Sequence, residues 1–320
     1  MNHFYRVILP IAALVISHGT LSAADTVELK QRWIAGKMYY QTMQTTQTSS
    51  FAVAGQNMEQ SVTTTMEISQ AVRPQADGKG KRMTLKYERV AMEMSLSGQK
   101  MGFDSSKPNE GNDPLGLSKT LGGMVGKDLQ ILLNEKDEIT GIENYDDFIK
   151  QLAASPVPGM DMSKMFSKDS ITQMMKGQAL QSLPNHPVKA GDTWPFTTNV
   201  ELPQLGKVGI AGTYTLKGMG SFEGNPVAQI DADAKISMDF SGATGAQPGV
   251  SQLAQLGMKV ENGSLKGTIQ FDPKLGVARD TQMTQELTMT MKNPTDPSAK
   301  ITVPIKQNIE MKLTKIEDVK

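Results

Sequence analysis

The sequence contains no cysteine among its 320 residues. Disulfides, thiolate metal sites, cysteine nucleophiles and a lipid attached to an N-terminal cysteine are therefore excluded. Histidine is scarce as well, with 3 residues, so few imidazoles are available to bind a metal or to transfer a proton. We expect neither a metal nor any other cofactor.

The chain also lacks an excess of charge of one sign. Lys and Arg together number 33, as do Asp and Glu, and no long run of either sign occurs. A nucleic-acid-binding protein needs a basic surface that this balance does not provide. Aromatic residues make up only 5% of the chain, whereas methionine is frequent, with 22 residues. Methionine is a flexible filler of apolar space, and it suits both a plastic pocket and an imperfectly packed core.

Residues 1–24 have the pattern of a secretory signal peptide. Arg6 precedes a short apolar stretch, and small residues ending in Ala24 precede Asp25. The apolar stretch is shorter than the ~20 residues that cross a bilayer and contains Pro10, so a cleaved signal is favoured over an anchor. We expect cleavage after Ala24, no transmembrane segment in the mature chain, and a location in the periplasm or outside the cell.

Residues 25–320 predict one β-rich domain. Apolar and polar residues alternate over 25–104 and again over 189–320, which is typical of strands with one buried face. The phase of the alternation changes near Glu88 and Arg89, and this change predicts a β-bulge. Strands of this length favour a curved sheet over a flat one.

The middle part, residues 113–183, has helical spacing and one hairpin signal instead. Its motifs predict, in order, a short helix from Pro114 to Gly126, a hairpin over Lys127–Leu133 and Glu138–Glu143, a helix capped by Asn144, and a helix over Ser167–Leu180. We expect about three strands before this insert, about two inside it and about six after it.

The predicted fold is therefore α+β and predominantly β, with long curved antiparallel sheets that form an unclosed barrel and a short helical insert in mid-chain. Gly224-Asn225-Pro226 marks a hairpin tip among the later strands. Pro304 has no backbone N–H, so the final strand is expected at a sheet edge or with irregular pairing at that residue.

Several short motifs resemble a family of secreted bacterial β-rich proteins of unknown function. These motifs are Val125-Gly126-Lys127, Leu129 with Ile131-Leu132, Ile139-Thr140-Gly141-Ile142-Glu143, Leu183-Pro184 and Pro187-Val188-Lys189-Ala190-Gly191-Asp192-Thr193-Trp194. The family has no established activity, so the resemblance implies no catalytic residue. The architecture is also similar to the lipoprotein-carrier and lipid-binding lipoprotein fold, an unclosed half-barrel whose helices cover an apolar concavity.

Two functions are left open by these observations. The first is a non-enzymatic exported protein that binds a lipid or another apolar small molecule in the concavity of a curved sheet. The second is a structural or interaction protein of the cell envelope with a filled core and no ligand. No catalytic motif occurs, so no catalytic residue is assigned. The residues expected to line the ligand site are Met83, Leu85, Val90, Met92, Met94, Ile236, Met238 and Phe240.

Other motifs have a structural explanation that we favour over a functional one. Met92-Glu93-Met94, Met289-Thr290-Met291 and Met160-Asp161-Met162 have the Met-x-Met spacing of Cu(I) sites, but strand alternation also produces the first two. Trp194 is expected to anchor the core, and His186 to lie in a surface loop. Ser97 and Lys100 have the Ser-x-x-Lys spacing, but they follow a strand in a turn rather than beginning a helix.

Overall fold

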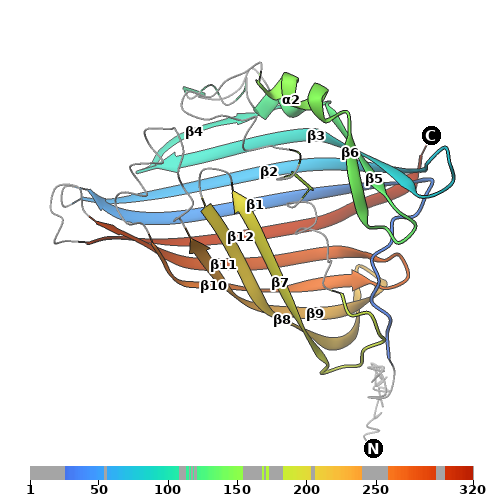
Figure 1. The fold of residues 1–320 in the computed structure, drawn as a ribbon. Coiled ribbons are helices and arrows are strands. Elements are labelled where there is room, and N and C mark those ends of the chain that lie inside the picture. Colours follow the sequence, from blue (N-terminus) through green and yellow to red (C-terminus); the bar gives the residue numbers. More distant parts are fainter. Residues whose placement is uncertain are drawn as a thin grey trace, which may run out of the picture.

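The computed structural model is dominated by one large, strongly curved sheet (Figure 1). The residues whose placement it describes are 26–53, 56–107, 113–114, 116, 118, 121–153, 168, 171–172, 183–202, 206–239, 259–292 and 300–319. The predicted signal peptide and its cleavage site lie outside these residues, as does most of the helix expected over Ser167–Leu180.

The sheet contains 12 antiparallel strands in the described residues. Their order across the sheet is β6-β5-β3-β2-β1-β12-β11-β10-β9-β8-β7, and β4 pairs with β3 beside β5. Because no pairing joins β6 to β7 in the described part of the chain, the sheet does not close, and the predicted fold class is confirmed. The strands are β1 (Lys37–Val53), β2 (Gln56–Pro74), β3 (Lys81–Leu96), β4 (Gln99–Asp104), β5 (Asp128–Leu133), β6 (Ile139–Glu143), β7 (Thr193–Leu202), β8 (Gly206–Phe222), β9 (Asn225–Asp239), β10 (Lys259–Asp272), β11 (Val277–Lys292) and β12 (Lys300–Asp318).

Residues paired across an antiparallel sheet point to the same face, so the strand registers assign residues to two faces. One face carries Tyr39 and its partners, which are mostly apolar, and we call it the apolar face. On four strands it comprises odd-numbered residues: 39–49 of β1, 301–313 of β12, 281–291 of β11 and 265–271 of β10. On four others it comprises even-numbered residues: 58–72 of β2, 228–238 of β9, 208–216 of β8 and 194–198 of β7. On β3 it comprises residues 83, 85, 87, 90, 92, 94 and 96, because the bulge changes the parity. The opposite face is called the polar face.

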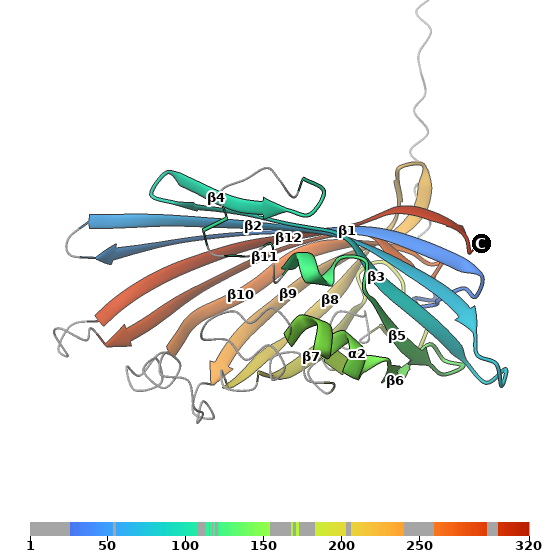
Figure 2. The same ribbon diagram turned by 90° about the horizontal axis from the view of Figure 1, so that it is seen from above.

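The most deeply buried residues lie at one end of the strands, where β1, β3 and β9 begin and β2, β8, β10 and β12 end. We call this end the core end. It lies beside the C-terminus in Figures 1 and 2. One buried cluster includes Leu216, Ala228, Ile230, Ile269 and Phe271 of β8, β9 and β10. A second includes Tyr39 of β1, Val72 of β2, Met83 of β3, Ile131 of β5 and Leu313 of β12.

Segments outside the sheet cover the apolar face at the core end. Helix α2 (Tyr145–Ala153) places Phe148 against Leu129 and Ile142 of the β5–β6 hairpin, together with Met124 of the 3-10 helix η1 (Gly122–Met124). In Figure 2, α2 accordingly lies alongside β5 and β6. The chain before β1 contributes Leu29, which is buried against β8, β9 and β10.

The β-bulge predicted near Glu88 is confirmed. Arg89 pairs with Glu67 and Tyr87 pairs with Ile68, so Glu88 is the extra residue of β3. If Glu88 instead occupied a regular paired position, the apolar residues before and after this point would lie on opposite faces. The hairpin tip before Asn225 is also confirmed, because a turn at Glu223-Gly224 joins β8 to β9 and the pairing resumes at Phe222 with Asn225.

Three local expectations need correction. The last strand is not at an edge, because β12 lies between β1 and β11. The alternative expectation, irregular pairing at Pro304, is confirmed, because the ladder with β1 ends at Ser49 and Ile305 and Pro304 pairs only with Thr288 of β11. A helix was expected from Pro114 to Gly126, but just before Gly126 the chain forms the 3-10 helix η1. Four strands rather than about three precede the insert, because the short strand β4 was not anticipated.

Asn144 precedes a helix as predicted, but its side chain does not bond to that helix. The side-chain amide instead donates to the backbone oxygen of Asp128 at 2.9 Å and accepts from the backbone N–H of Gln130 at 2.9 Å. Asn144 therefore fastens the start of α2 to β5, which holds the helix over the apolar face.

Candidate ligand-binding face

The apolar face changes character along its strands. On β2, Val72 is fully buried, whereas Met66 and Val62 of the same face are half-buried. On β12, Leu313 is buried, whereas Ile305 is half-buried. We call the part of the apolar face away from the core end the distal half. Its half-buried apolar residues include Met43, Val62, Met66, Met92, Met94, Met283, Met289, Met291, Ile301, Val303, Ile305, Ile309 and Met311.

Methionines from neighbouring strands meet in the distal half. Met43 of β1 pairs with Met311 of β12 on one side and with Met66 of β2 on the other. Met94 of β3 pairs with Met101 of β4. Because thioether side chains are flexible and polarisable, such a surface adapts to apolar groups of varied shape.

The structure places the predicted ligand-lining residues on the apolar face, but in two environments. Met83, Leu85, Val90 and Ile236 are buried, whereas Met92, Met94 and Met238 are half-buried; Phe240 lies outside the described residues. The members on β3 and the members on β9 are separated by β2, β1, β12, β11 and β10. Only the half-buried residues are therefore available to a ligand in this structure.

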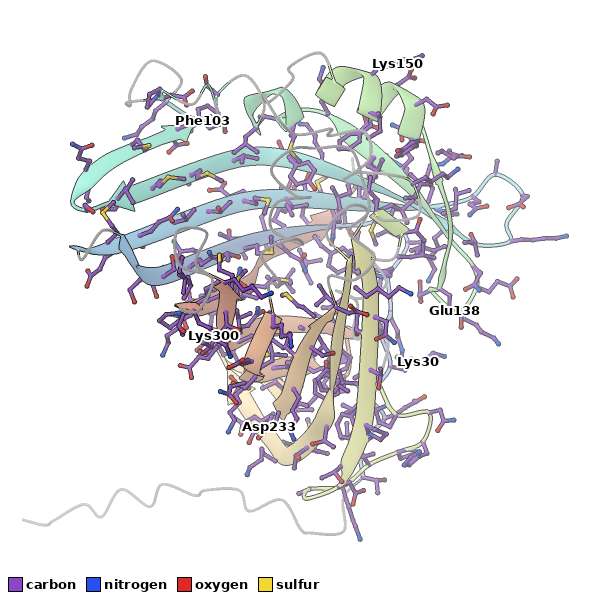
Figure 3. The ribbon with its side chains drawn as sticks, turned by 60° about the vertical axis from the view of Figure 1, so that its left-hand side comes forward. Lys30, Phe103, Glu138, Lys150, Asp233 and Lys300 are labelled. Carbon is purple, nitrogen blue, oxygen red and sulfur yellow. The ribbon has the colours of Figure 1, made fainter. Side chains whose placement is uncertain are left out.

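The apolar face carries no Asp, Glu, Lys or Arg at the positions assigned to it above. The charged side chains of these strands lie on the polar face, where Asp233 is paired with Lys266 at 3.6 Å and Lys306 with Glu286 at 3.0 Å. Figure 3 shows Asp233 on β9. Burial raises the pKa of Tyr87 and of Tyr214, so these two phenols of the apolar face stay neutral at physiological pH. The face is thus uncharged as well as apolar.

Sequence reasoning missed a set of uncharged polar residues in the distal half. Gln47 of β1 pairs with Gln307 of β12, which pairs with Gln285 of β11. We call these three residues the glutamine row. The signal that could have found them is a glutamine at a position where the two-residue alternation calls for an apolar residue.

The remaining candidate motifs have the structural roles expected of them where the structure describes them. Trp194 is buried, 7% exposed, and its ring lies 5.9 Å from that of Tyr214. His186 is exposed. Met92 and Met94 lie two apart on one face of β3, as strand alternation requires, whereas the Met160-Asp161-Met162 motif lies outside the described residues.

Within the part of the chain that the structure describes, no group of three or more His, Asp or Glu side chains could hold a metal ion. In the same residues, no helix has the length and apolar character needed to cross a membrane. The expected absence of a metal stays a prediction.

The chain belongs to a family of unknown function, DUF6263, whose model matches residues 78–278. No curated protein matches the chain in sequence. Among solved structures, it is similar to lipovitellin from a study of lipid–protein interactions, with 12% identity, a TM-score of 0.48, and coverage of 90% of this chain but only 26% of the lipovitellin chain.

Two bacterial structures are similar at a lower level. One is DynF from the dynemicin biosynthesis pathway of Micromonospora chersina, with 10% identity, a TM-score of 0.20, and coverage of 97% of this chain and 92% of the other. The second is a domain named for outer membrane lipoprotein sorting, from Vibrio parahaemolyticus, with 10% identity, a TM-score of 0.13, and coverage of 87% and 85%. These similarities concern the fold alone and carry no inference about a ligand.

Proposed function

We propose that this protein is a non-enzymatic carrier that holds an apolar ligand, such as a lipid acyl chain, against the distal half of the apolar face. The observation that supports the proposal is the change in burial along single strands. The same face of β2 and β12 is buried at the core end and half-buried further along.

The physical argument rests on the cost of exposed apolar surface. Each Å² of apolar surface removed from water is worth about 25 cal/mol, so a face of half-buried methionines gains stability when it is covered. At the core end, Leu29 and Phe148 provide such a cover. A flexible acyl chain of matching chemistry provides it in the distal half.

Export belongs to the same proposal. A lipid moving through an aqueous compartment outside the inner membrane needs a protein that shields its hydrocarbon from water. The predicted signal peptide over residues 1–24 is consistent with such a location.

The test compares three substitutions on β3 in the exported protein. Met92→Glu and Met94→Glu each place a charge in the distal half, and we expect folded protein with less bound lipid, measured by organic extraction and mass spectrometry. Met83→Glu is the control at the core end. Because Met83 is 3% exposed, its replacement buries an unpaired charge and is expected to unfold the protein.

Glu93→Gln is a second control, because Glu93 lies between the two methionines on the polar face. It should leave both folding and bound lipid unchanged. If the wild-type protein is lipid-free, takes up no apolar dye, and unfolds when Met92 or Met94 is replaced, the distal half is ordinary core. The carrier proposal is then wrong, and a structural protein with a filled interior is favoured.

A further inference from the structure

The glutamine row crosses the distal half near its middle. At ~3.3 Å per strand residue, Gln47 lies about 26 Å along β1 from Tyr39, well beyond the buried clusters. The side chains of Gln47, Gln285 and Gln307 are half-buried. Within the described residues, no hydrogen bond joins these three side-chain amides to another protein group.

The surroundings of this row are uncharged, and on β11 and β12 they are apolar, whereas on β1 Gln47 lies between Thr45 and Ser49 of the same face. On the core side, Met283 and Ile309 pair with each other, and on the distal side Leu287 pairs with Ile305. An amide offers both hydrogen-bond donors and acceptors, and leaving these unpaired in apolar surroundings is unfavourable. Water can bond these half-buried amides while the face is open, but a ligand that covers the glutamine row displaces this water. Such a ligand has to supply hydrogen-bonding groups of its own, because the described protein groups supply none.

The absence of charge on the apolar face limits what these groups are. An ionised group placed there loses its hydration and finds no side chain of opposite charge at the assigned positions. Neutral groups such as ester carbonyls or hydroxyls form hydrogen bonds with glutamine amides without this cost.

Resting on the carrier function proposed above, we propose that the ligand is a lipid whose uncharged ester or hydroxyl groups bind the glutamine row, while its hydrocarbon lies on the flanking methionines. An ionised headgroup, where the lipid has one, stays outside the apolar face. The glutamine row is then a specificity-determining element, because a pure hydrocarbon leaves its amides unpaired.

The experiment uses two neutral probes of similar length, methyl oleate and heptadecene, which differ in the ester group. Each displaces the apolar dye N-phenylnaphthylamine from the full-length protein. The wild-type protein is expected to bind methyl oleate about tenfold more tightly than heptadecene, as one or two hydrogen bonds imply. The triple variant Gln47→Met, Gln285→Met, Gln307→Met keeps the side-chain length and removes the amides. It should lose this preference and still bind heptadecene.

The control is the double variant Gln44→Met, Gln282→Met, which changes two exposed glutamines of the polar face and should keep the preference. If the triple variant fails to fold, Gln307→Met alone removes the central amide and should reduce the preference. Equal binding of both probes by the wild type, or an undiminished preference in the triple variant, overturns this inference and leaves the carrier proposal standing. Failure of the wild type to bind the dye or either probe refutes the carrier proposal itself, and a dimer in light scattering then identifies a second copy as the cover.

Discussion

Arg89 of β3 and Asp104 of β4 form a two-point ion pair, with Nε to Oδ1 at 3.0 Å and Nη2 to Oδ2 at 2.7 Å. Arg89 also donates to Glu67 of β2 at 2.9 Å. One guanidinium thus joins three strands directly beside the bulge at Glu88. These contacts lie on the polar face and help to hold the short strand β4 at the margin of the distal half.

We predict that Asp104→Asn lowers the free energy of unfolding by about 1 kcal/mol at neutral pH, because it breaks a partly exposed pair with favourable two-point geometry. Asp233→Asn is the matched control, since its pair with Lys266 is 3.6 Å long and largely exposed. Urea denaturation measures both. If Asp233→Asn lowers the free energy of unfolding as much as Asp104→Asn does, the special role of the Arg89–Asp104 pair is contradicted.

The same pair predicts a pH dependence. Hydrogen bonds from Arg89 hold the pKa of the Asp104 carboxyl well below its usual range. Since the folded-state pKa is lowered, the stabilisation is fully present above the unfolded-state value of about 4 and is lost as pH falls below it toward the folded-state pKa. The stability difference between wild type and Asp104→Asn should therefore be constant above about pH 5 and shrink in acid. A difference that grows in acid would contradict this assignment.

Much of the local structure could be predicted because its signals are local. The two-residue alternation and its change of phase at Glu88 are properties of neighbouring residues, and the strands and the bulge follow from them. The strand order could not be predicted in this way. Pro304 predicted either an edge strand or irregular pairing, and the edge position is wrong because β12 acquires its second neighbour from β1, at the other end of the chain.

The glutamine row was also missed because its members come from distant parts of the chain. Gln47 and Gln307 are 260 residues apart in sequence and become neighbours only through the β1–β12 pairing. Gln285 and Gln307 each look like a single departure from the apolar alternation, and Gln47 is one of several polar residues on this face of β1. Only the register shows that the departures coincide, and the same register shows that Met43, Met66 and Met311 adjoin one another.

The expected export makes a prediction about the mature chain. Mass spectrometry of the exported protein should show an N-terminus at Asp25 or within about two residues of it. Such a cut leaves Leu29, which is buried against β8 to β10, in the folded protein. Recovery of the full-length chain in the membrane fraction would show that residues 1–24 act as an anchor.

Gly212 marks a close approach of two strands. A Cβ atom at this position would overlap with the Cβ of Ala234 and with the backbone oxygen of Asp233. We expect Gly212→Ala to lower the free energy of unfolding by about 2 kcal/mol, because the neighbouring strand β9 has to shift. Gly123→Ala is the control, since a Cβ there meets nothing within 4 Å. Thermal unfolding distinguishes the two variants, and equal costs would show that β8 and β9 adjust freely.

The bulge itself gives the sharpest test of how the apolar face is built. Removing Glu88 leaves Tyr87 opposite Ile68 and Arg89 opposite Glu67, so β3 becomes a regular strand and every other residue keeps its face. The deletion loses the hydrogen bond from Ser69 to Glu88, 2.7 Å long, and the local twist of the bulge. We expect the variant to fold, with a loss of about 1–2 kcal/mol.

Deleting Ala91 instead is the matched control. If the bulge is kept, Met92 and Met94 then lie on the polar face. If Glu88 instead pairs as a regular strand residue, the bulge is lost and Arg89 turns toward the apolar face. Either outcome buries a charge or exposes the methionines, and we expect a loss of several kcal/mol or no folded protein. Circular dichroism and urea denaturation compare the two deletions. If removing Glu88 proves as damaging as removing Ala91, the bulge is required for the curvature of the sheet itself, because the alternation of faces is preserved in the first variant alone.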